Sequence, residues 1–242
     1  MDERYIRAEA MLGAAAMARL RQSRVAVVGL GGVGSWCAEA LARCGVGSLI
    51  LLDQDEVSLF NRNRQLCALE STVGRAKTAV MAERIRAIDP ACHVTELCIR
   101  YEAESREALF SLRPDFIVDA IDLVACKLDL IETALSRGIP IVSALGTGNK
   151  RDASQLRICD IAKTEGCPFA RVIRRELRRR GIQHLDVVFS AEEAAEAAQS
   201  ETPPPGRRSV PGSLVWVPAT AGMLLAQHVV LRLAEDSDNT QS

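Results

Sequence analysis

The sequence has little that would support a zinc site or a disulfide framework. Its eight cysteines are scattered along 242 residues, no two of them have C-x-x-C spacing, and there are only three histidines. Zinc sites and disulfide-stapled domains depend on closely spaced cysteines and histidines. Most of the cysteines stand within apolar runs, so we expect them to be small core residues.

Strong net charge and a long uninterrupted apolar run are lacking as well, and we expect no signal peptide at the start. The formal net charge is −1 and 25% of the residues are charged, which is typical of a soluble globular chain. Acidic residues stand at positions 2 and 3, where a signal peptide carries basic ones. Leu214–Leu233 is the one membrane candidate, but it contains Pro218, Gln227 and His228. We therefore expect a core strand followed by a core helix there, and a cytoplasmic protein with no membrane contact.

The sequence does contain a strand–helix–strand pattern around a glycine-rich stretch. Arg24–Val28 is a short β-branched run, typical of a buried strand. Trp36–Cys44 predicts a helix, and Ser48–Leu52 predicts a second strand that ends before Asp53. Between the first strand and the helix lie Gly29, Gly31, Gly32 and Gly34. This βαβ unit has the layout of a nucleotide-binding site.

The glycines and Asp53 each suit one part of a nucleotide. Glycines allow a tight turn and a close approach of the backbone to a phosphate, which the free N–H groups of the helix N-terminus then bind. A carboxylate in the place of Asp53 can hold the ribose hydroxyls. An ordinary NAD-binding unit fits this stretch as well as an ATP-binding one. The residues after Asp53 are therefore needed to distinguish the two nucleotides.

Strands and helices alternate with short connections through the first 150 residues. This pattern predicts an α/β fold with a doubly wound, Rossmann-like, mostly parallel sheet, and a C-terminal extension that completes the sheet. We expect a single domain with an N-terminal helix (1–22), a nucleotide-binding core (23–150) and a substrate-binding half (151–235) with a mobile loop at about 191–212. Ligands of such sheets lie at the carboxyl ends of the strands. Four segments should meet there: 29–34, 53–65, 119–122 and 144–149.

The loop after Asp53 carries charges that hydride transfer does not need. A nucleotide triphosphate has about four negative charges and requires fixed cations at its phosphates. Arg64 and Lys77 are placed to supply them, and Asp122 could hold a magnesium ion. Other polar residues of the loop are Asp55, Asn61, Asn63 and Gln65. Solvated surface charges are the simpler alternative for Arg64 and Lys77, and a helix N-cap is the alternative for Asp122.

Taken in order, these residues resemble the signature of the ThiF/MoeB/HesA family, relatives of the ubiquitin-activating enzymes. The matching motifs are Gly29-x-Gly31-Gly32-x-Gly34, Asp53-x-Asp55, Asn61-x-Asn63-Arg64-Gln65, Lys77 and Asp119-x-x-Asp122, with Arg4-Tyr5-x-Arg7-x5-Gly13 near the start. The resemblance spans about residues 4–235. It implies an enzyme that adenylates a carboxylate with ATP and Mg²⁺ and releases pyrophosphate.

The resemblance also implies a role for each matching residue. The four glycines, with Asp53, Asp55 and Gln65, would bind the nucleotide, and Asp53 would hold the ribose. Asn61, Arg64 and Lys77 would bind and polarise the phosphates, and Asp122 would coordinate magnesium. Because the family is typically homodimeric, Arg7 would reach the γ-phosphate in the partner subunit. Charge neutralisation of this kind lets pyrophosphate leave.

The second half of the chain points to one branch of this family. Sulfur-carrier adenylyltransferases usually have two zinc-binding C-x-x-C pairs, which are lacking here. The runs Gly146–Lys150, Asp160–Thr164, Cys167–Leu177 and Ser209–Ser213 instead resemble the branch that dehydrates threonylcarbamoyladenosine in tRNA. The alternatives are an adenylyltransferase for a ubiquitin-like sulfur carrier and a non-catalytic NAD-binding protein. The resemblance also leaves open whether the protein has a cysteine desulfurase as a sulfur-relay partner.

A tRNA substrate requires a basic surface. The spacing of i, i+3, i+4 and i+7 places four arginines on one helix face: Arg171, Arg174, Arg175 and Arg178. Four further arginines add to this positive charge: Arg179, Arg180, Arg207 and Arg208. A solvated charged face is the alternative. We assign no catalytic role to Cys167, because no base is placed beside it by the sequence.

Overall fold

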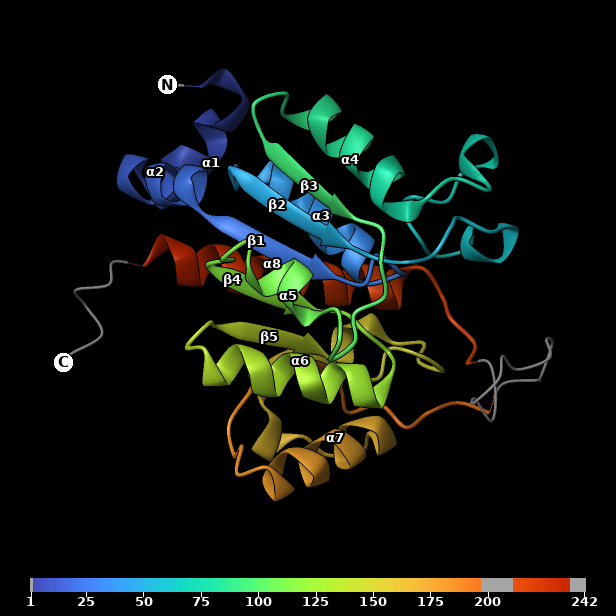
Figure 1. Cartoon of the computed structure of the whole chain (residues 1–242). Coiled ribbons are helices and arrows are strands. Elements are labelled where there is room, and N and C mark those ends of the chain that lie inside the picture. Colours follow the sequence, from blue (N-terminus) through green and yellow to red (C-terminus); the bar gives the residue numbers. More distant parts are fainter. Residues whose placement is uncertain (1, 197–210, 236–242) are drawn as a thin grey trace.

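A seven-stranded sheet runs through the middle of the computed structural model, which describes residues 2–196 and 211–235 (Figure 1). The strand order is β3-β2-β1-β4-β5-β7-β6, and within the described chain only β6 runs antiparallel to its neighbour. This confirms the predicted doubly wound, mostly parallel sheet, with β6 and β7 as the C-terminal extension that completes it. The strands are β1 (Arg24–Val28), β2 (Ser48–Leu52), β3 (His93–Leu97), β4 (Phe116–Asp119), β5 (Ile141–Ala144), β6 (Leu156–Asp160) and β7 (Asp186–Ser190).

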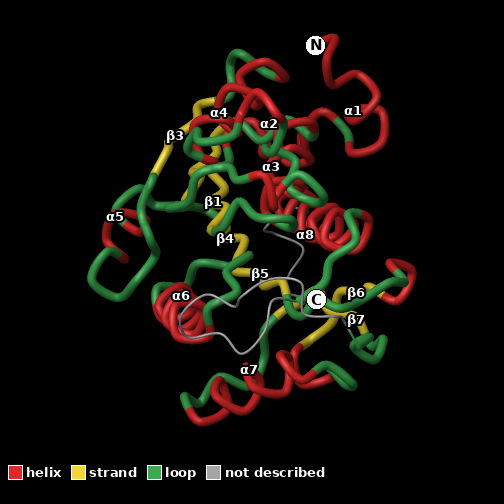
Figure 2. Tube along the Cα trace, turned by 90° about the vertical axis from the view of Figure 1, so that its right-hand side faces the viewer, coloured by secondary structure: helices red, strands yellow, loops and turns green. Residues whose placement is uncertain are grey.

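Helices cover both faces of the sheet because buried strand residues alternate between two apolar cores. In β1, Val25 and Val27 pack with α2, α3, α4 and α8, whereas Ala26 and Val28 pack with α5, α6 and α7. Figure 2 shows α5 and α6 on one side of the strands and α3 and α8 on the other. The helices are α1 (Ile6–Leu12), α2 (Ala14–Gln22), α3 (Gly34–Arg43), α4 (Lys77–Ile88), α5 (Arg106–Phe110), α6 (Val124–Ser136), α7 (Pro168–Arg179) and α8 (Trp216–Ala234).

The C-terminal apolar segment is a single helix, so the prediction of a strand at its start is wrong. By length and composition α8 could cross a membrane, but it lies in the core (Figure 1). Val217, Ala221 and Leu225 have no exposed surface. A Cβ atom on Gly222 would lie 2.4 Å from the carbonyl oxygen of Val33. Only glycine therefore allows α8 to pack this closely against the start of α3, where a strand could not fit.

The N-terminal region is also built differently from the prediction of one helix over residues 1–22. Gly13 has a φ of +85° and separates α1 from α2. This conformation favours glycine, so the break is encoded in the sequence. The helices α1 and α2 lie toward the amino ends of the strands, where α2 leads directly into β1 (Figure 1).

The carboxyl ends of the central strands lie level with one another. Val28 is in register with Leu52 of β2 on one side and with Asp119 of β4 on the other. The loops that follow these three strands therefore meet at one edge of the sheet. Most of the loop predicted at 191–212, including Arg207 and Arg208, lies outside the described residues.

Candidate active site

A cavity of about 640 Å³ opens at the carboxyl ends of β1, β2 and β4. Nine of the predicted site residues line it: Gly29, Gly31, Asp53, Asp55, Asn61, Arg64, Gln65, Lys77 and Asp122. The 144–149 segment does not line it, which corrects the expectation that all four strand-end segments would meet in one place. β5 lies beyond β4 in the sheet, so its loop borders the cavity region from the side.

The glycines of the first loop have different tasks. Gly29 has a φ of +92°, and a Cβ atom there would lie 2.8 Å from the carbonyl oxygen of Ala120. A Cβ atom on Gly34 would overlap the carbonyl oxygen of Gly29 at 1.8 Å. These two glycines allow the turn itself. At Gly31 the nearest atom to a Cβ would be 3.9 Å away, so this residue leaves the cavity open, whereas Gly32 packs against Pro218 and Arg64.

Asp53 presents a fixed carboxylate at the end of β2. Its two oxygens accept hydrogen bonds from the backbone N–H groups of Leu30 (2.6 Å) and Asp55 (2.8 Å). Burial raises the pKa of this carboxyl, and the nearby charge of Lys77 opposes the rise. The Leu30 contact ties the end of β2 to the glycine loop, so Asp53 also orders the backbone around the cavity.

Lys77 is a nearly buried cation between two carboxylates. It is the first residue of α4, and its backbone N–H donates to the carbonyl of Asp55 (3.0 Å). Its Nζ lies 2.8 Å from an Asp55 oxygen and 3.8 Å from an Asp53 oxygen. The ammonium is thus anchored at the cavity wall rather than solvated at the surface. This excludes the alternative that Lys77 is a solvated surface charge.

Arg64, Asn61 and Gln65 are held by the turn that follows β2. The Arg64 guanidinium donates to the carbonyl of Phe60 and to the side chain of Asn63, both at 2.9 Å. Asn61 Oδ1 accepts from the backbone N–H of Ser58 (3.1 Å) in a capping box. Gln65 is buried. The contacts with Phe60 and Asn63, which belong to the same turn, therefore orient the Arg64 side chain at the cavity.

Asp122 lines the cavity from the turn after β4, and the structure excludes its alternative role as an N-cap. The N-cap of α6 is Leu123, and no side chain caps this helix. The described residues contain no group of three His, Cys, Asp or Glu side chains that could hold a metal ion. A metal at Asp122 would therefore need further ligands from a bound molecule such as a phosphate.

The prediction from sequence missed a buried polar cluster directly beneath this turn. Asp119, Lys127 and Ser143 have no exposed surface. Lys127 Nζ lies 2.6 Å from Asp119 Oδ2 and 2.8 Å from Ser143 Oγ, and the other Asp119 oxygen accepts from the backbone N–H of Ile121 (3.0 Å). Burial lowers the pKa of the Lys127 ammonium, and the Asp119 carboxylate opposes this. A single lysine within the apolar stretch of α6 was the available signal.

Loop residues after β3 complete the cavity and were missed as well. Ile99, Arg100 and Tyr101 are among the residues that line it. The Tyr101 hydroxyl donates to Asp129 on α6 (2.9 Å), and the side chain is buried. No motif marks these residues in the sequence, because the course of the loop after β3 is what brings them to the cavity.

The arginines of α7 gather around a surface hollow of about 430 Å³. Arg171, Arg175 and Arg178 are exposed and line it together with Arg174 and Arg179. Arg174 is half-buried and donates to the carbonyl of Thr164 (2.6 Å) and to its hydroxyl, so it also holds the preceding loop. Arg171 and Arg178 form no ion pair with any described residue, unlike Arg175 and Arg179, which contact Glu176.

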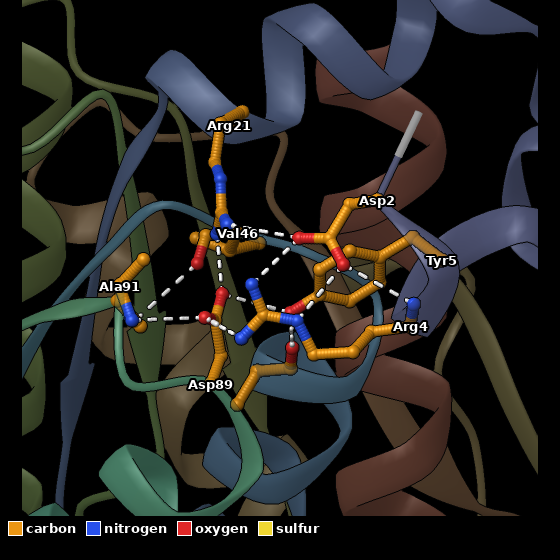
Figure 3. A network of polar contacts seen from close by, with 9 residues as sticks. Asp2, Arg4, Tyr5, Arg21, Val46, Asp89 and Ala91 are labelled. Carbon is orange, nitrogen blue, oxygen red and sulfur yellow. Dashed lines mark hydrogen bonds and ion pairs between the residues drawn. The ribbon is translucent and has the colours of Figure 1, made fainter.

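Arg7 does not lie with the other predicted residues. It is exposed on α1 and does not line the cavity of its own chain. The segment that carries it is fastened by the network in Figure 3, in which Arg4 and Arg21 pair with the buried Asp89. The Tyr5 hydroxyl also donates to Asp89 (2.9 Å). α1 is thus fixed on the body of the domain with Arg7 facing outward.

Comparison with known proteins agrees with this geometry. The profile of the ThiF family matches residues 3–241. The tRNA threonylcarbamoyladenosine dehydratase of Bacillus subtilis (strain 168) is 40% identical, in a match that covers 98% of this chain and 96% of that protein. The enzyme of the same name from Escherichia coli (strain K12) is 40% identical, in a match that covers 75% of this chain and 71% of that protein.

Solved structures extend the similarity to the fold. The crystal structure of the Escherichia coli tRNA N6-threonylcarbamoyladenosine dehydratase TcdA in complex with ATP matches with a TM-score of 0.86 and 35% identity. The match covers 96% of this chain and 93% of that one. The matching motifs of the cavity, the family profile and these full-length similarities lead to one conclusion: the chain belongs to the ThiF family.

Proposed function

We propose that this protein is an ATP-dependent dehydratase that acts on threonylcarbamoyladenosine in tRNA. The observation that carries the proposal is the joint placement of Arg64, Lys77 and Asp122 in one cavity behind a glycine loop. The similarity to the Bacillus subtilis dehydratase along almost the whole chain supports the same substrate. TcdA has been crystallised with ATP and with AMP, which supports ATP as the nucleotide used here.

The residues of the cavity fit the parts of ATP. Gly31 leaves space for the phosphates close to the backbone, and the carboxylate of Asp53 suits the ribose hydroxyls. Lys77 and Arg64 supply the positive charge that the β- and γ-phosphates require. Asp122 would hold Mg²⁺ together with phosphate oxygens, and the ion would supply further charge neutralisation there.

In the first step an oxygen of the threonyl carboxylate attacks the α-phosphorus of ATP. The bond from this phosphorus to the oxygen that bridges the α- and β-phosphates breaks, and pyrophosphate leaves with the electron pair. Arg64 and Lys77 stabilise the negative charge that develops on it. A nucleophilic group of the same nucleoside then attacks the activated carbonyl carbon and gives up its proton to solvent. The bond from this carbon to the phosphate oxygen breaks, and AMP leaves with the electron pair. The net change in the nucleoside is the loss of one water, and the short distance within one nucleoside favours this cyclisation.

The arginine face of α7 is the surface that we propose for tRNA. The first turn of α7 lies against the loop after β5, because a Cβ atom on Gly146 would be 2.4 Å from Cys167 Sγ. The arginines therefore begin beside the edge of the sheet that holds the cavity. A tRNA on this face would have its phosphates neutralised while the modified nucleoside reaches the site.

We also propose that the protein is a homodimer in the cytoplasm, where its tRNA substrate is found. Arg7 is exposed and lies outside the cavity of its own chain. A second copy could bring this guanidinium to the triphosphate, and a C₂ dimer would complete two sites at once. A sulfur-relay partner, a cysteine desulfurase, stays a prediction from the family resemblance alone.

Release of AMP from ATP tests the proposed function. The purified protein is incubated with tRNA that carries threonylcarbamoyladenosine and, in parallel, with the same tRNA unmodified, and the product nucleosides are analysed by mass. We expect AMP only with the modified tRNA, together with a nucleoside lighter by one water. AMP that forms only with a small carrier protein ending in Gly-Gly would instead support the sulfur-carrier alternative. That alternative has weaker support, because the ThiS adenylyltransferase of Escherichia coli is 30% identical over 62% of this chain.

A further inference from the structure

Lys150 carries a buried charge that the proposed site does not explain. The side chain belongs to a residue that is only 3% exposed, and its Nζ has no hydrogen-bond partner among the described residues. A buried ammonium without a partner is strongly unfavourable, so natural proteins rarely keep one without a use. Lys150 lies in the connection that follows β5, at the same edge of the sheet as the cavity.

The backbone on both sides of Lys150 is held by hydrogen bonds although the ammonium is not. Asn149 has a φ of +57° and exchanges hydrogen bonds with Gly212: its N–H donates to the Gly212 carbonyl (2.8 Å) and its Oδ1 accepts from the Gly212 N–H (2.6 Å). Its carbonyl accepts from Ala195 N–H (2.8 Å). The carboxylate of Glu192 accepts from the N–H groups of Arg151 (2.9 Å) and Asp152 (3.0 Å).

These contacts have a consequence for the charge of Lys150. Glu192 comes close in the structure, but its oxygens are directed to backbone N–H groups rather than to Nζ. The ammonium is therefore held on a rigid base and has three donors to offer. An unpaired cation on an anchored stretch of backbone is suited to bind an anion toward which its side chain turns.

Contacts on both sides connect the segment of Lys150 with the cavity. Ser143 at the end of β5 donates to Asp119 (2.6 Å), three residues before Asp122. On the other side, Asn63 donates to the carbonyl of Ser213 (3.1 Å), next to the Gly212 that bonds Asn149. Lys150 thus lies at the border between the phosphate-binding loop and the substrate-binding half, without lining the nucleotide cavity itself.

We propose that the Lys150 ammonium binds the carboxylate that ATP activates, which is the threonyl carboxylate of the modified nucleoside if the proposed function holds. The phosphates have their own cations in Arg64 and Lys77, which line the cavity, whereas Lys150 lies outside the nucleotide cavity at the same edge of the sheet. A carboxylate approaching a triphosphate meets about four like charges, so a cation at that side assists its approach. The four-carbon side chain of lysine can turn toward it.

Binding and turnover of the Lys150→Met variant test this proposal. Methionine keeps the length of the side chain and removes the charge, and Lys150→Arg keeps the charge. Lys163→Met is the matched control, because it removes one positive charge from an exposed lysine outside the cavity. We would measure the Kd of ATP without tRNA, the Kd of modified and unmodified tRNA, AMP release and the Tm of each protein.

For Lys150→Met we expect an unchanged Kd for ATP and a Tm no lower than that of the wild type, because a buried unpaired charge is removed. The KM for modified tRNA should rise about 10- to 100-fold, as expected for one lost charge-assisted hydrogen bond. The preference for modified over unmodified tRNA should disappear. Lys150→Arg should recover part of it, and Lys163→Met should affect both tRNAs equally.

Three results would overturn the assignment. Weaker ATP binding by Lys150→Met would identify a phosphate as the anion. A retained preference for modified tRNA would show that the carboxylate is bound elsewhere. A lower Tm with losses in every assay, repeated in Lys150→Gln, would give Lys150 a structural role. If the wild type releases no AMP with modified tRNA, the proposed function itself fails, which the wild-type measurement separates from these outcomes.

Discussion

Single charged residues around the cavity act in two different ways. Lys77 and Arg64 line the cavity, while Lys127 lies beneath it with no exposed surface. Lys127 neutralises Asp119, and Asp119 in turn fixes the backbone N–H of Ile121 in the turn before Asp122. A buried ion pair of this kind tolerates the removal of both partners far better than the removal of one.

Replacement of Lys127 alone should therefore be more damaging than replacement of the pair. We expect Lys127→Met to lower the free energy of unfolding by about 3–5 kcal/mol, because the Asp119 carboxylate is left buried and unpaired. The double variant Lys127→Met with Asp119→Asn should regain at least half of that loss. Denaturant unfolding of the two single variants and the double variant measures this coupling. Strictly additive losses would contradict it.

Site residues could be predicted where a motif carries them, and not where three-dimensional packing does. Nine residues of the predicted set line the cavity, because the glycine loop and the strand ends fix their positions locally. Lys127 and Tyr101 were missed, since their roles depend on Asp119 and Asp129, which come close only in the folded chain. Lys150 was missed as well, because no local sequence pattern predicts that this lysine is buried.

Secondary-structure elements were predictable in their kind and order, and less so at their ends. β1 and β2 have the predicted bounds, because short β-branched and apolar runs are bordered by glycine and aspartate. The start of α8 was mistaken for a strand, since an apolar run alone does not tell a buried strand from a buried helix. The close packing of α8 on α3 at Gly222, which is seen only in the folded chain, distinguishes the helix from a strand here.

The anchoring of α1 should depend on pH through Asp89. Burial alone would raise the pKa of this carboxyl, but hydrogen bonds from Arg21, the Ala91 N–H and Tyr5 hold it below its usual value. A carboxylate with a lowered pKa stabilises the fold above its unfolded pKa, near 3.9, and this contribution is lost as the pH falls through the folded pKa. We expect Asp89→Asn to cost about 2–4 kcal/mol at pH 7.

Thermal unfolding between pH 7 and pH 3 checks this expectation. The difference in Tm between the wild type and Asp89→Asn should shrink as the pH falls below about 4. Glu70→Gln is the control, because Glu70 pairs with Arg62 at the exposed surface and should change the Tm little at any pH. A difference that stays constant over the whole range would show that the carboxylate charge is not what fastens α1.

The helix α7 is the element on which the tRNA proposal depends. Replacement of Arg171, Arg175 and Arg178 by glutamine should weaken tRNA binding and reduce the slope of log Kd against log salt by about 2 to 3, close to one for each phosphate contact. Replacement of three exposed arginines on other elements, Arg75, Arg86 and Arg137, is the matched control. Equal slopes for the two triple variants would move the tRNA surface away from α7.

At the scale of the whole molecule, the fold separates the proposed site from a residue proposed to complete it. The cavity lies at the carboxyl edge of the sheet, whereas α1 lies toward the amino ends of the strands (Figure 1). The segment before α1 is fastened there by the bond from Tyr5 to Asp89 (Figure 3). This network holds the start of α1 on its own domain, and Arg7 lies outside the cavity of its own chain. In the proposed dimer, Arg7 of one subunit would complete the cavity of the other, although it lies outside the cavity of its own chain.

Mixing of two inactive variants tests this arrangement. Arg7→Ala and Asp122→Ala should each abolish AMP release while keeping the Tm of the wild type. In a dimer that contains one subunit of each kind, the cavity with an intact Asp122 faces a partner with an intact Arg7, so one of its two sites is complete. After subunit exchange in equal amounts, half of the dimers are mixed and activity should return to about a quarter of the wild-type value. If Arg7 instead serves its own subunit, every cavity in the mixture lacks one of the two residues, and no activity should return.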